Sequence, residues 1–194
     1  FAHRLHALGK EFELHYSASR QDRAGFLNDL QSFAWANRVV YHFSDRGTRA
    51  DLDEILKGYR DGWHVYTCGP DRYMDGVTAA AERQGFPEEA RHLEYFSVPD
   101  VPDYVNHEFT LRLVRTGKEL LIPADKSATD VLAENGIHVD VKCSDGICGV
   151  CKCGLLSGKV EHRDFVLSKK QRESAIILCQ SRAEEPAGII EVAL

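Results

Sequence analysis

The 194-residue sequence lacks features that define several classes of protein. No run of apolar residues approaches the roughly 20 needed to span a bilayer, so we expect no membrane association. With 24 basic against 30 acidic residues the formal net charge is −6, and the chain lacks the positive charge typical of a nucleic-acid-binding protein. No segment has the pattern of a secretion signal, so we expect a cytoplasmic protein.

The sequence does not begin with methionine but with Phe1. Phe1, Leu5 and Leu8 share one face of a helix that would end at Gly9. We therefore interpret the numbering as beginning inside a helix, and we expect the chain to be a fragment of a longer polypeptide.

Strand and helix patterns alternate along the first part of the chain. The predicted strands are 12–16, 39–43, 64–68 and 93–96, and the predicted helices are 23–30, 50–56 and 71–84. Alternation at this spacing is typical of βαβ units in a mostly parallel sheet, so residues 1–97 are predicted to form an α/β domain.

The pattern changes after residue 97. Residues 98–107 contain Pro99 and Pro102 and show no periodicity, which indicates a linker. A hairpin at 109–122, a helix at 128–135, a cysteine-rich loop and late strands at 176–179 and 188–194 follow. We interpret residues 108–194 as a separate compact α+β domain.

The cysteines carry the strongest chemical signal. Five of the six lie in the last part of the chain, and Cys143-x4-Cys148-x2-Cys151 with a distant Cys179 has the spacing of a plant-type [2Fe–2S] site. Two irons and two bridging sulfides need four thiolates, which a tight loop and a neighbouring strand end can supply together. Gly146 and Gly149 would let backbone N–H groups approach the sulfurs of such a cluster.

Other interpretations of the cysteines compete with this one. Zinc normally requires a second Cys-x2-Cys or a histidine pair at finger-like spacing, and neither follows. A thioredoxin-like redox pair would have no extra cysteine before it, and a disulfide framework does not suit a chain without secretion features. Buried structural cysteines remain an alternative for single positions. Cys153 is able to replace Cys151 as a ligand, but only Cys151 completes the spacing, so we treat Cys153 as a spare.

The cysteine loop, the gap from Cys151 to Cys179 and the segment Tyr66-Thr67-Cys68-Gly69-Pro70 together resemble the phthalate dioxygenase reductase family. That family has a flavin domain, a nicotinamide-nucleotide domain and a ferredoxin domain in this order, and the chain resembles its C-terminal part. The resemblance implies a partial Rossmann-like nucleotide-binding domain of the ferredoxin-reductase type, followed by a β-grasp ferredoxin domain. The same module also ends self-sufficient haem monooxygenase fusions.

The resemblance also implies roles for residues of the nucleotide domain. Thr67, Cys68, Gly69 and Pro70 correspond to the turn at which the nicotinamide ring approaches the flavin. The alternative from the residues alone is a Gly-Pro turn into a helix.

Further contacts are implied for the nucleotide and the flavin. Ser17, Ser19 and Arg20 resemble the segment that contacts the adenosine half of the nucleotide, although the residues alone favour a capping serine and a solvated arginine. Phe96 matches the aromatic residue that packs on the flavin ring, whereas most aromatic residues in terminal strands belong to the core.

Two family features are absent from the sequence: the flavin-binding barrel and a glycine-rich G-x-G-x-x-G loop. The resemblance implies a reductase that passes electrons from NAD(P)H through FMN, held mainly by the missing domain, to a [2Fe–2S] cluster. The acceptor would be a terminal oxygenase, either a separate Rieske-type enzyme or a fused haem domain. A zinc-stabilised β-grasp interaction module without redox activity is the alternative, and a stand-alone dehydrogenase is disfavoured by the missing glycine loop.

Overall fold

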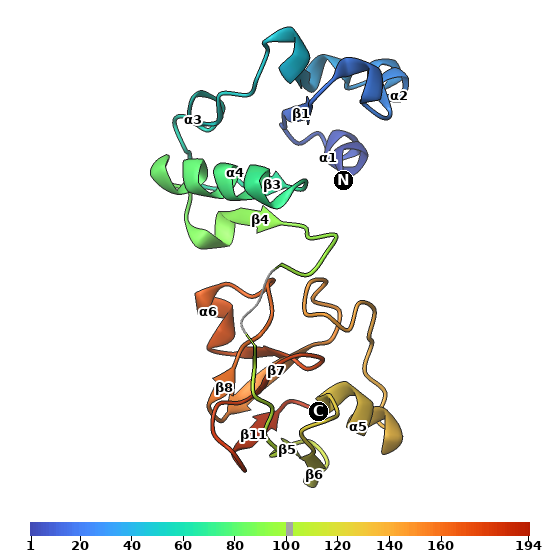
Figure 1. The fold of residues 1–194 in the computed structure, drawn as a ribbon, viewed down its shortest axis with the longest axis vertical. Helices are drawn as coiled ribbons and strands as arrows, with labels where there is room; N and C mark the ends of the chain where they lie inside the picture. The colour runs from blue at the N-terminus through green and yellow to red at the C-terminus, as the bar shows by residue number, and fades with distance from the viewer. Residues whose placement is uncertain (100–102) are drawn as a thin grey trace. The chain divides into compact units, whose positions relative to one another are not determined.

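The computed structural model describes residues 1–99 and 103–194, which form two compact units, Phe1–Gly58 and Tyr59–Leu194 (Figure 1). Residues 100–102 of the predicted linker lie outside the described residues, and the predicted domain boundaries stay a prediction. Within the described ranges, no helix is long and apolar enough to cross a membrane.

The first unit contains one pair of parallel strands. β1 (Leu14–Ala18) pairs with β2 (Val39–Phe43) in a register that sets Leu14 opposite Val39. The remaining elements are short: α1 (Ala2–Ala7), α2 (Leu27–Ser32), α3 (Leu52–Ile55) and the 3₁₀ turns η1 (Gln21–Arg23), η2 (Ala36–Arg38) and η3 (Ser44–Arg46).

Two of these elements differ from the sequence prediction. β1 begins at Leu14 and extends to Ala18, so Ser17 lies in the strand and not in the turn after it. α2 begins only at Leu27, because Phe26 in front of it has a left-handed backbone conformation with φ of 60°. The strand β2 has the predicted boundaries.

The second unit opens with a βαβ arrangement. β3 (Val65–Thr67) leads into α4 (Asp71–Arg83), and β4 (Arg91–Leu93) follows the turn η4 (Glu88–Ala90) and pairs with β3 in parallel. The buried face of α4 consists of Met74, Val77, Ala80 and Ala81, three or four residues apart as helical packing requires. The predicted helix is confirmed, whereas the predicted strand 93–96 lies too late, because β4 ends at Leu93.

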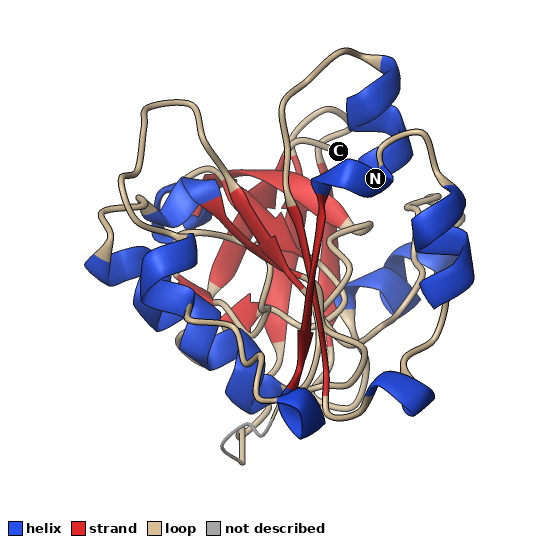
Figure 2. Cartoon of the chain, turned by 90° about the horizontal axis from the view of Figure 1, so that it is seen from above, coloured by secondary structure: helices blue, strands red, loops and turns tan. Residues whose placement is uncertain are grey.

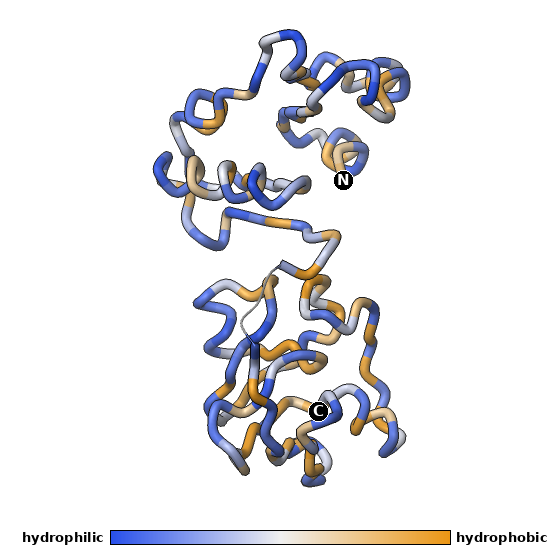
Figure 3. Tube along the Cα trace, in the orientation of Figure 1, coloured by the Kyte–Doolittle hydropathy of each residue, from blue (hydrophilic) through white to orange (hydrophobic). Residues whose placement is uncertain are grey.

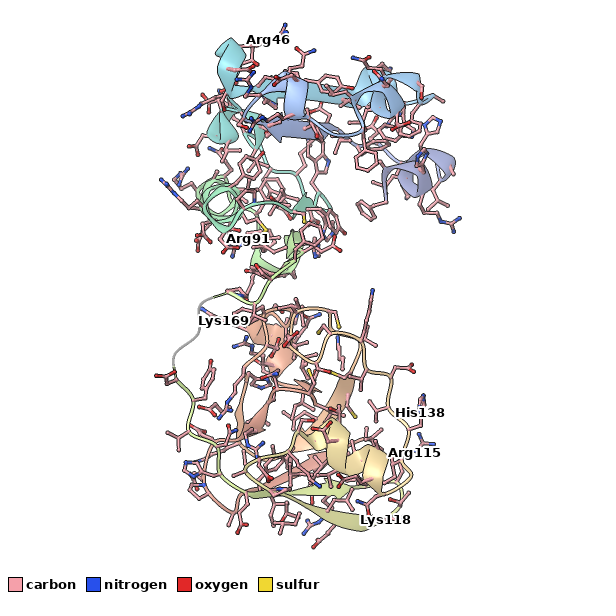
Figure 4. All side chains as sticks on the ribbon, turned by 45° about the vertical axis from the view of Figure 1, so that its right-hand side comes forward. Arg46, Arg91, Arg115, Lys118, His138 and Lys169 are labelled. Atoms are coloured by element: carbon pink, nitrogen blue, oxygen red, sulfur yellow. The ribbon has the colours of Figure 1, made fainter. Side chains whose placement is uncertain are left out.

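The rest of the second unit is built on a five-stranded sheet in the order β6-β5-β11-β7-β9. Its strands are β5 (Phe109–Leu113), β6 (Lys118–Ile122), β7 (Lys152–Ser157), β9 (Ala175–Ile177) and β11 (Ile189–Val192). β5 and β6 form the predicted antiparallel hairpin, with Arg115 and Lys118 at its turn (Figure 4), and β11 pairs with β5 in parallel. β8 (Val160–Glu161) pairs with β10 (Arg182–Ala183) in a separate two-stranded ladder, and α6 (Lys169–Arg172) precedes β9.

One helix covers the core of this sheet. α5 (Ala128–Glu134) begins at Ser127, whose side chain accepts from the backbone of Asp130 in a capping box. Alternate residues of β5 pack against Leu132 of α5 and Ile190 of β11 in one buried cluster. In Figure 3 the hydrophobic colour recurs along these strands. The central parallel pair with a helix packed on it is the predicted β-grasp arrangement.

A long connection without helix or strand joins α5 to β7 (Figures 1 and 2). It contains residues 135–151 and therefore most of the cysteine-rich segment. The sequence analysis predicted this loop but missed β7, which begins within the cysteine run at Lys152.

Candidate iron–sulfur centre

The four predicted ligand cysteines come from two segments of the second unit. Cys143 and Cys148 lie on the long loop, and Cys151 lies in the turn immediately before β7. Cys179 follows β9, which pairs with β7. The two segments are joined at the site itself, because the backbone N–H of Leu178 donates to the carbonyl of Cys151 at 3.3 Å.

The thiols approach one another as two pairs. Cys143 interacts with Cys148, and Cys151 with Cys179. Interaction with Cys151, to which the Cys179 thiol is the donor, and burial raise the pKa of Cys179, and the charge of Cys143 raises it further, so the two pairs lie within electrostatic reach. Among the described residues, no three His, Cys, Asp or Glu side chains are arranged to hold a single metal ion. Two thiol pairs suit two bridged irons better than one zinc ion.

Hydrogen bonding prepares one thiol of each pair for metal binding. The Cys179 thiol lowers the pKa of Cys151 to about 6. For Cys143, burial raises the pKa, but hydrogen bonds led by the backbone N–H of Asp145, at 3.4 Å, outweigh burial and the pKa is lowered. Because iron binds the thiolate, these contacts favour ligation at both pairs.

The loop is shaped by glycines between the ligands. Gly146 and Gly149 have φ values of 74° and 72°, a conformation that side chains rarely adopt. A Cβ on Gly146 would lie 3.3 Å from the carbonyl oxygen of Arg163 and the Cα of Asp164, so a larger residue does not fit without a shift. The loop glycines are expected to direct backbone N–H groups at the cluster sulfurs, and this role stays a prediction.

Cys153 lies in a different environment from the buried pair of predicted ligand cysteines. It is on β7, 9% exposed, and belongs to the main buried cluster under the sheet. Cys151 and Cys179 instead share a smaller buried cluster with Leu167. The geometry supports Cys151 as the ligand and Cys153 as the spare, and the ligand set stays a prediction.

The sequence analysis missed a segment that borders the site. Residues 162–167 run alongside the cysteine loop, where the backbone N–H of Phe165 donates to the carbonyl of Gly146 at 3.1 Å. Leu167 packs on the buried ligand cysteines. No spacing in the sequence indicates this neighbourhood, because the two segments meet only through the fold.

The turn 67–70 lies at the carboxyl end of the parallel pair β3–β4. Thr67 ends β3, and Gly69 and Pro70 lead into α4. The exposed thiol of Cys68 donates to the carbonyl of Glu94 at 3.1 Å, and burial raises its pKa. Open α/β sheets bind ligands at this end of their strands. Phe96, two residues further on, is 84% exposed, so it is not the core residue that its predicted strand position suggested.

The predicted adenosine contacts lie in the first unit. Ser17, Ser19 and Arg20 are all exposed at the carboxyl end of β1 or just beyond it. Arg20 forms a two-pronged ion pair with Asp22, with N–O distances of 2.8 and 2.7 Å. A phosphate would have to replace Asp22 as the partner of this guanidinium. The roles of these three residues stay a prediction.

Known proteins that resemble this chain in sequence include iron–sulfur proteins and oxygenase reductases. Residues 112–184 match the family of 2Fe-2S iron-sulfur cluster binding domains. The chain is 37% identical, over 98% of its length, to the reductase subunit of tert-butanol monooxygenase/tert-amyl alcohol desaturase from Aquincola tertiaricarbonis, of which it covers 60%.

Two solved structures are similar over the whole chain. Phthalate dioxygenase reductase matches with a TM-score of 0.51 and 32% identity, over 98% of this chain and 60% of that protein. An intact type IV self-sufficient cytochrome P450 monooxygenase matches with a TM-score of 0.72 and 29% identity, over 100% of this chain and 25% of that protein.

The fold and the domain match define a chain with a 2Fe-2S iron-sulfur cluster binding domain over residues 112–184. Along almost its whole length the chain is similar to phthalate dioxygenase reductase, as the sequence motifs predicted. The predicted combination of an α/β and an α+β fold is thereby confirmed. The chain spans about 60% of the length of the reductases it matches.

Proposed function

We propose that this chain is the electron-delivering part of an oxygenase reductase. The observation that carries the proposal is the convergence of Cys143, Cys148, Cys151 and Cys179 as two thiol pairs beside a glycine-shaped loop. A [2Fe–2S] cluster bound there would supply one-electron transfer. The thiols would hold it, and the Gly146 backbone would stabilise its sulfur ligands.

The electron source is proposed to be NAD(P)H. A nicotinamide delivers two electrons as hydride while a [2Fe–2S] cluster accepts one at a time, so a flavin is required between them. By resemblance this is FMN, held mainly by a domain outside the 194 residues. Cys68 and its turn would orient the nicotinamide, and exposed Phe96 would pack on the flavin.

The nucleotide's other half is proposed to bind at the first unit. Ser17 and Ser19 would contact the adenosine portion and Arg20 a phosphate, once Asp22 releases its guanidinium.

The electron acceptor is proposed to be a terminal oxygenase. The reductase relative serves a monooxygenase, and the P450 neighbour contains haem enzyme and reductase in one protein. Cys148 is exposed, so this end of the loop would be accessible to either acceptor, a separate Rieske-type oxygenase or a fused haem domain. A cytoplasmic location is part of the proposal, since reduced thiols persist there.

Metal analysis tests the proposal directly. Protein purified without oxygen should contain two irons and two acid-labile sulfides per chain. After reduction by dithionite it should give the spin-half EPR signal of a [2Fe–2S] cluster. Zinc without sulfide would instead establish the interaction module and overturn electron transfer.

A further inference from the structure

Asp164 carries a fully buried carboxylate in the segment beside the cysteine loop. Its side chain is 0% exposed. One oxygen, Oδ1, accepts from the backbone N–H groups of Val166 and Leu167, at 3.1 and 2.7 Å. The other, Oδ2, has no hydrogen-bond partner. An unpartnered carboxylate oxygen in the interior is costly unless neighbouring charge or an interaction compensates.

Two cationic or protonatable side chains face this oxygen. His162 Nδ1 lies 3.7 Å and Arg172 Nη2 3.9 Å from Oδ2, and Arg172 Nη2 also donates to the Asp164 carbonyl at 2.8 Å. His162 Nδ1 and Arg172 Nε are themselves buried without partners. The three side chains therefore form a compact charged group whose compensation is mainly electrostatic.

The backbone that carries this charged group packs on the cluster loop. The Cα of Asp164 would be 3.3 Å from a Cβ on Gly146, and the backbone N–H of Phe165 donates to the carbonyl of Gly146 at 3.1 Å. The carboxylate also fixes Leu167, which packs on the buried pair of predicted ligand cysteines. The charged group is thus joined to the predicted ligands through the loop backbone and through Leu167.

We propose that Asp164 is a positioning residue for the cluster, and that its charge, balanced by Arg172, sets the reduction potential of the site. The proposal rests on the proposed [2Fe–2S] function. Reduction adds an electron to a centre that already carries four thiolates. A nearby negative charge therefore disfavours the reduced form and a nearby positive charge favours it, most strongly where water is excluded.

Three substitutions separate charge from shape. Asp164→Asn keeps an oxygen for the two backbone N–H groups but removes the charge, and Arg172→Gln removes the balancing charge. Asp125→Asn changes an exposed aspartate of the same domain and is the matched control. The midpoint potential of each iron-loaded protein is measured by a redox titration monitored by EPR.

The expected result is a pair of opposite shifts. Asp164→Asn should move the midpoint potential to more positive values and Arg172→Gln to more negative values, with Asp125→Asn at the wild-type potential. Unchanged potentials in both, shifts of one sign, or loss of the cluster from both would overturn the proposal. If Asp164→Asn alone loses its cluster, a negative shift of the midpoint potential in Arg172→Gln supports the proposal and a positive or absent shift overturns it. Wild-type protein without two irons and two sulfides would instead refute the proposed function.

Discussion

Arg182 provides the sharpest test of how the ferredoxin domain is held together. Its guanidinium is buried, with the residue 5% exposed, and lies 5.1 Å from the ring centre of Phe109. It donates to the carbonyl of His107 from Nε and Nη2, at 3.2 and 2.7 Å. It also donates to Pro123 at 2.7 Å and to Lys126 at 2.9 Å. Arg182→Met would keep the apolar stem and remove all four hydrogen bonds.

The cost of this substitution follows from the three carbonyls. The Pro123 carbonyl keeps a second donor, the backbone N–H of Lys126 at 3.4 Å, so its loss costs least. The other two each lose a charged donor, which costs about 1.5 kcal/mol apiece. We therefore expect Arg182→Met to lower the free energy of unfolding of this domain by about 3 kcal/mol.

Hydrogen exchange of the backbone amides in β5 and β11 measures this loss, because these central strands exchange through global opening of the sheet. A loss of about 3 kcal/mol corresponds to a decrease in protection of roughly 100-fold. Arg115→Met, at the exposed hairpin turn of the same domain (Figure 4), is the control and should change protection by less than about threefold. A change below about tenfold in Arg182→Met would refute the reasoning.

Three further predictions concern the cluster and the nucleotide part. Cys148→Ser should abolish the cluster while Cys153→Ser keeps it, as visible absorbance and iron content will show; iron loss from the second variant would mean a different ligand set. Gly146→Ala should lower the yield of cluster on reconstitution severalfold, because its φ is 74° and its Cβ would press on neighbouring backbone at 3.3 Å. Burial, and then the neighbouring histidine, lower the pKa of His42 and of His92 in the folded protein below 6.5. The unfolded chain therefore binds protons more readily at these positions, and the free energy of unfolding decreases as the pH falls below about 6.5. The urea concentration at the midpoint of unfolding should be lower at about pH 5.5 than at about pH 7.5, and replacing both histidines by Gln should make this difference smaller. An equal difference in the variant and the wild type would contradict the prediction.

Local patterns in the sequence were sufficient for part of the fold. The hairpin of β5 and β6 was predictable because its apolar residues alternate around a Thr-Gly-Lys turn, and α4 because its apolar residues recur at helical spacing. In both cases the information lies within a few residues of chain.

Contacts between distant segments were not predictable from such patterns. β7 escaped notice because its sequence combines cysteine with Gly154, a residue that weakens a strand pattern. A Cβ at Gly154 would lie 3.1 Å from the Cβ of Ala193, a contact that only the fold reveals. Nδ1 of His15 in β1 lies 3.0 Å from Nε2 of His42 in β2, and Nδ1 of His64, just before β3, lies 2.9 Å from Nε2 of His92 in β4. These pairs arise from strand pairing, which brings together residues 27 and 28 positions apart.

The boundary of β7 also explains why two neighbouring cysteines have different environments. In a strand, residues two apart share one face, so a strand containing both Cys151 and Cys153 would direct both thiols into the same cluster of side chains. β7 begins at Lys152, between them. Cys151 remains in the preceding turn and meets Cys179, whereas Cys153 follows the pleat into the core. The cysteine spacing favoured Cys151 because only Cys151 completes the x4–x2 pattern, and the position at which the strand starts gives a physical reason for the same choice.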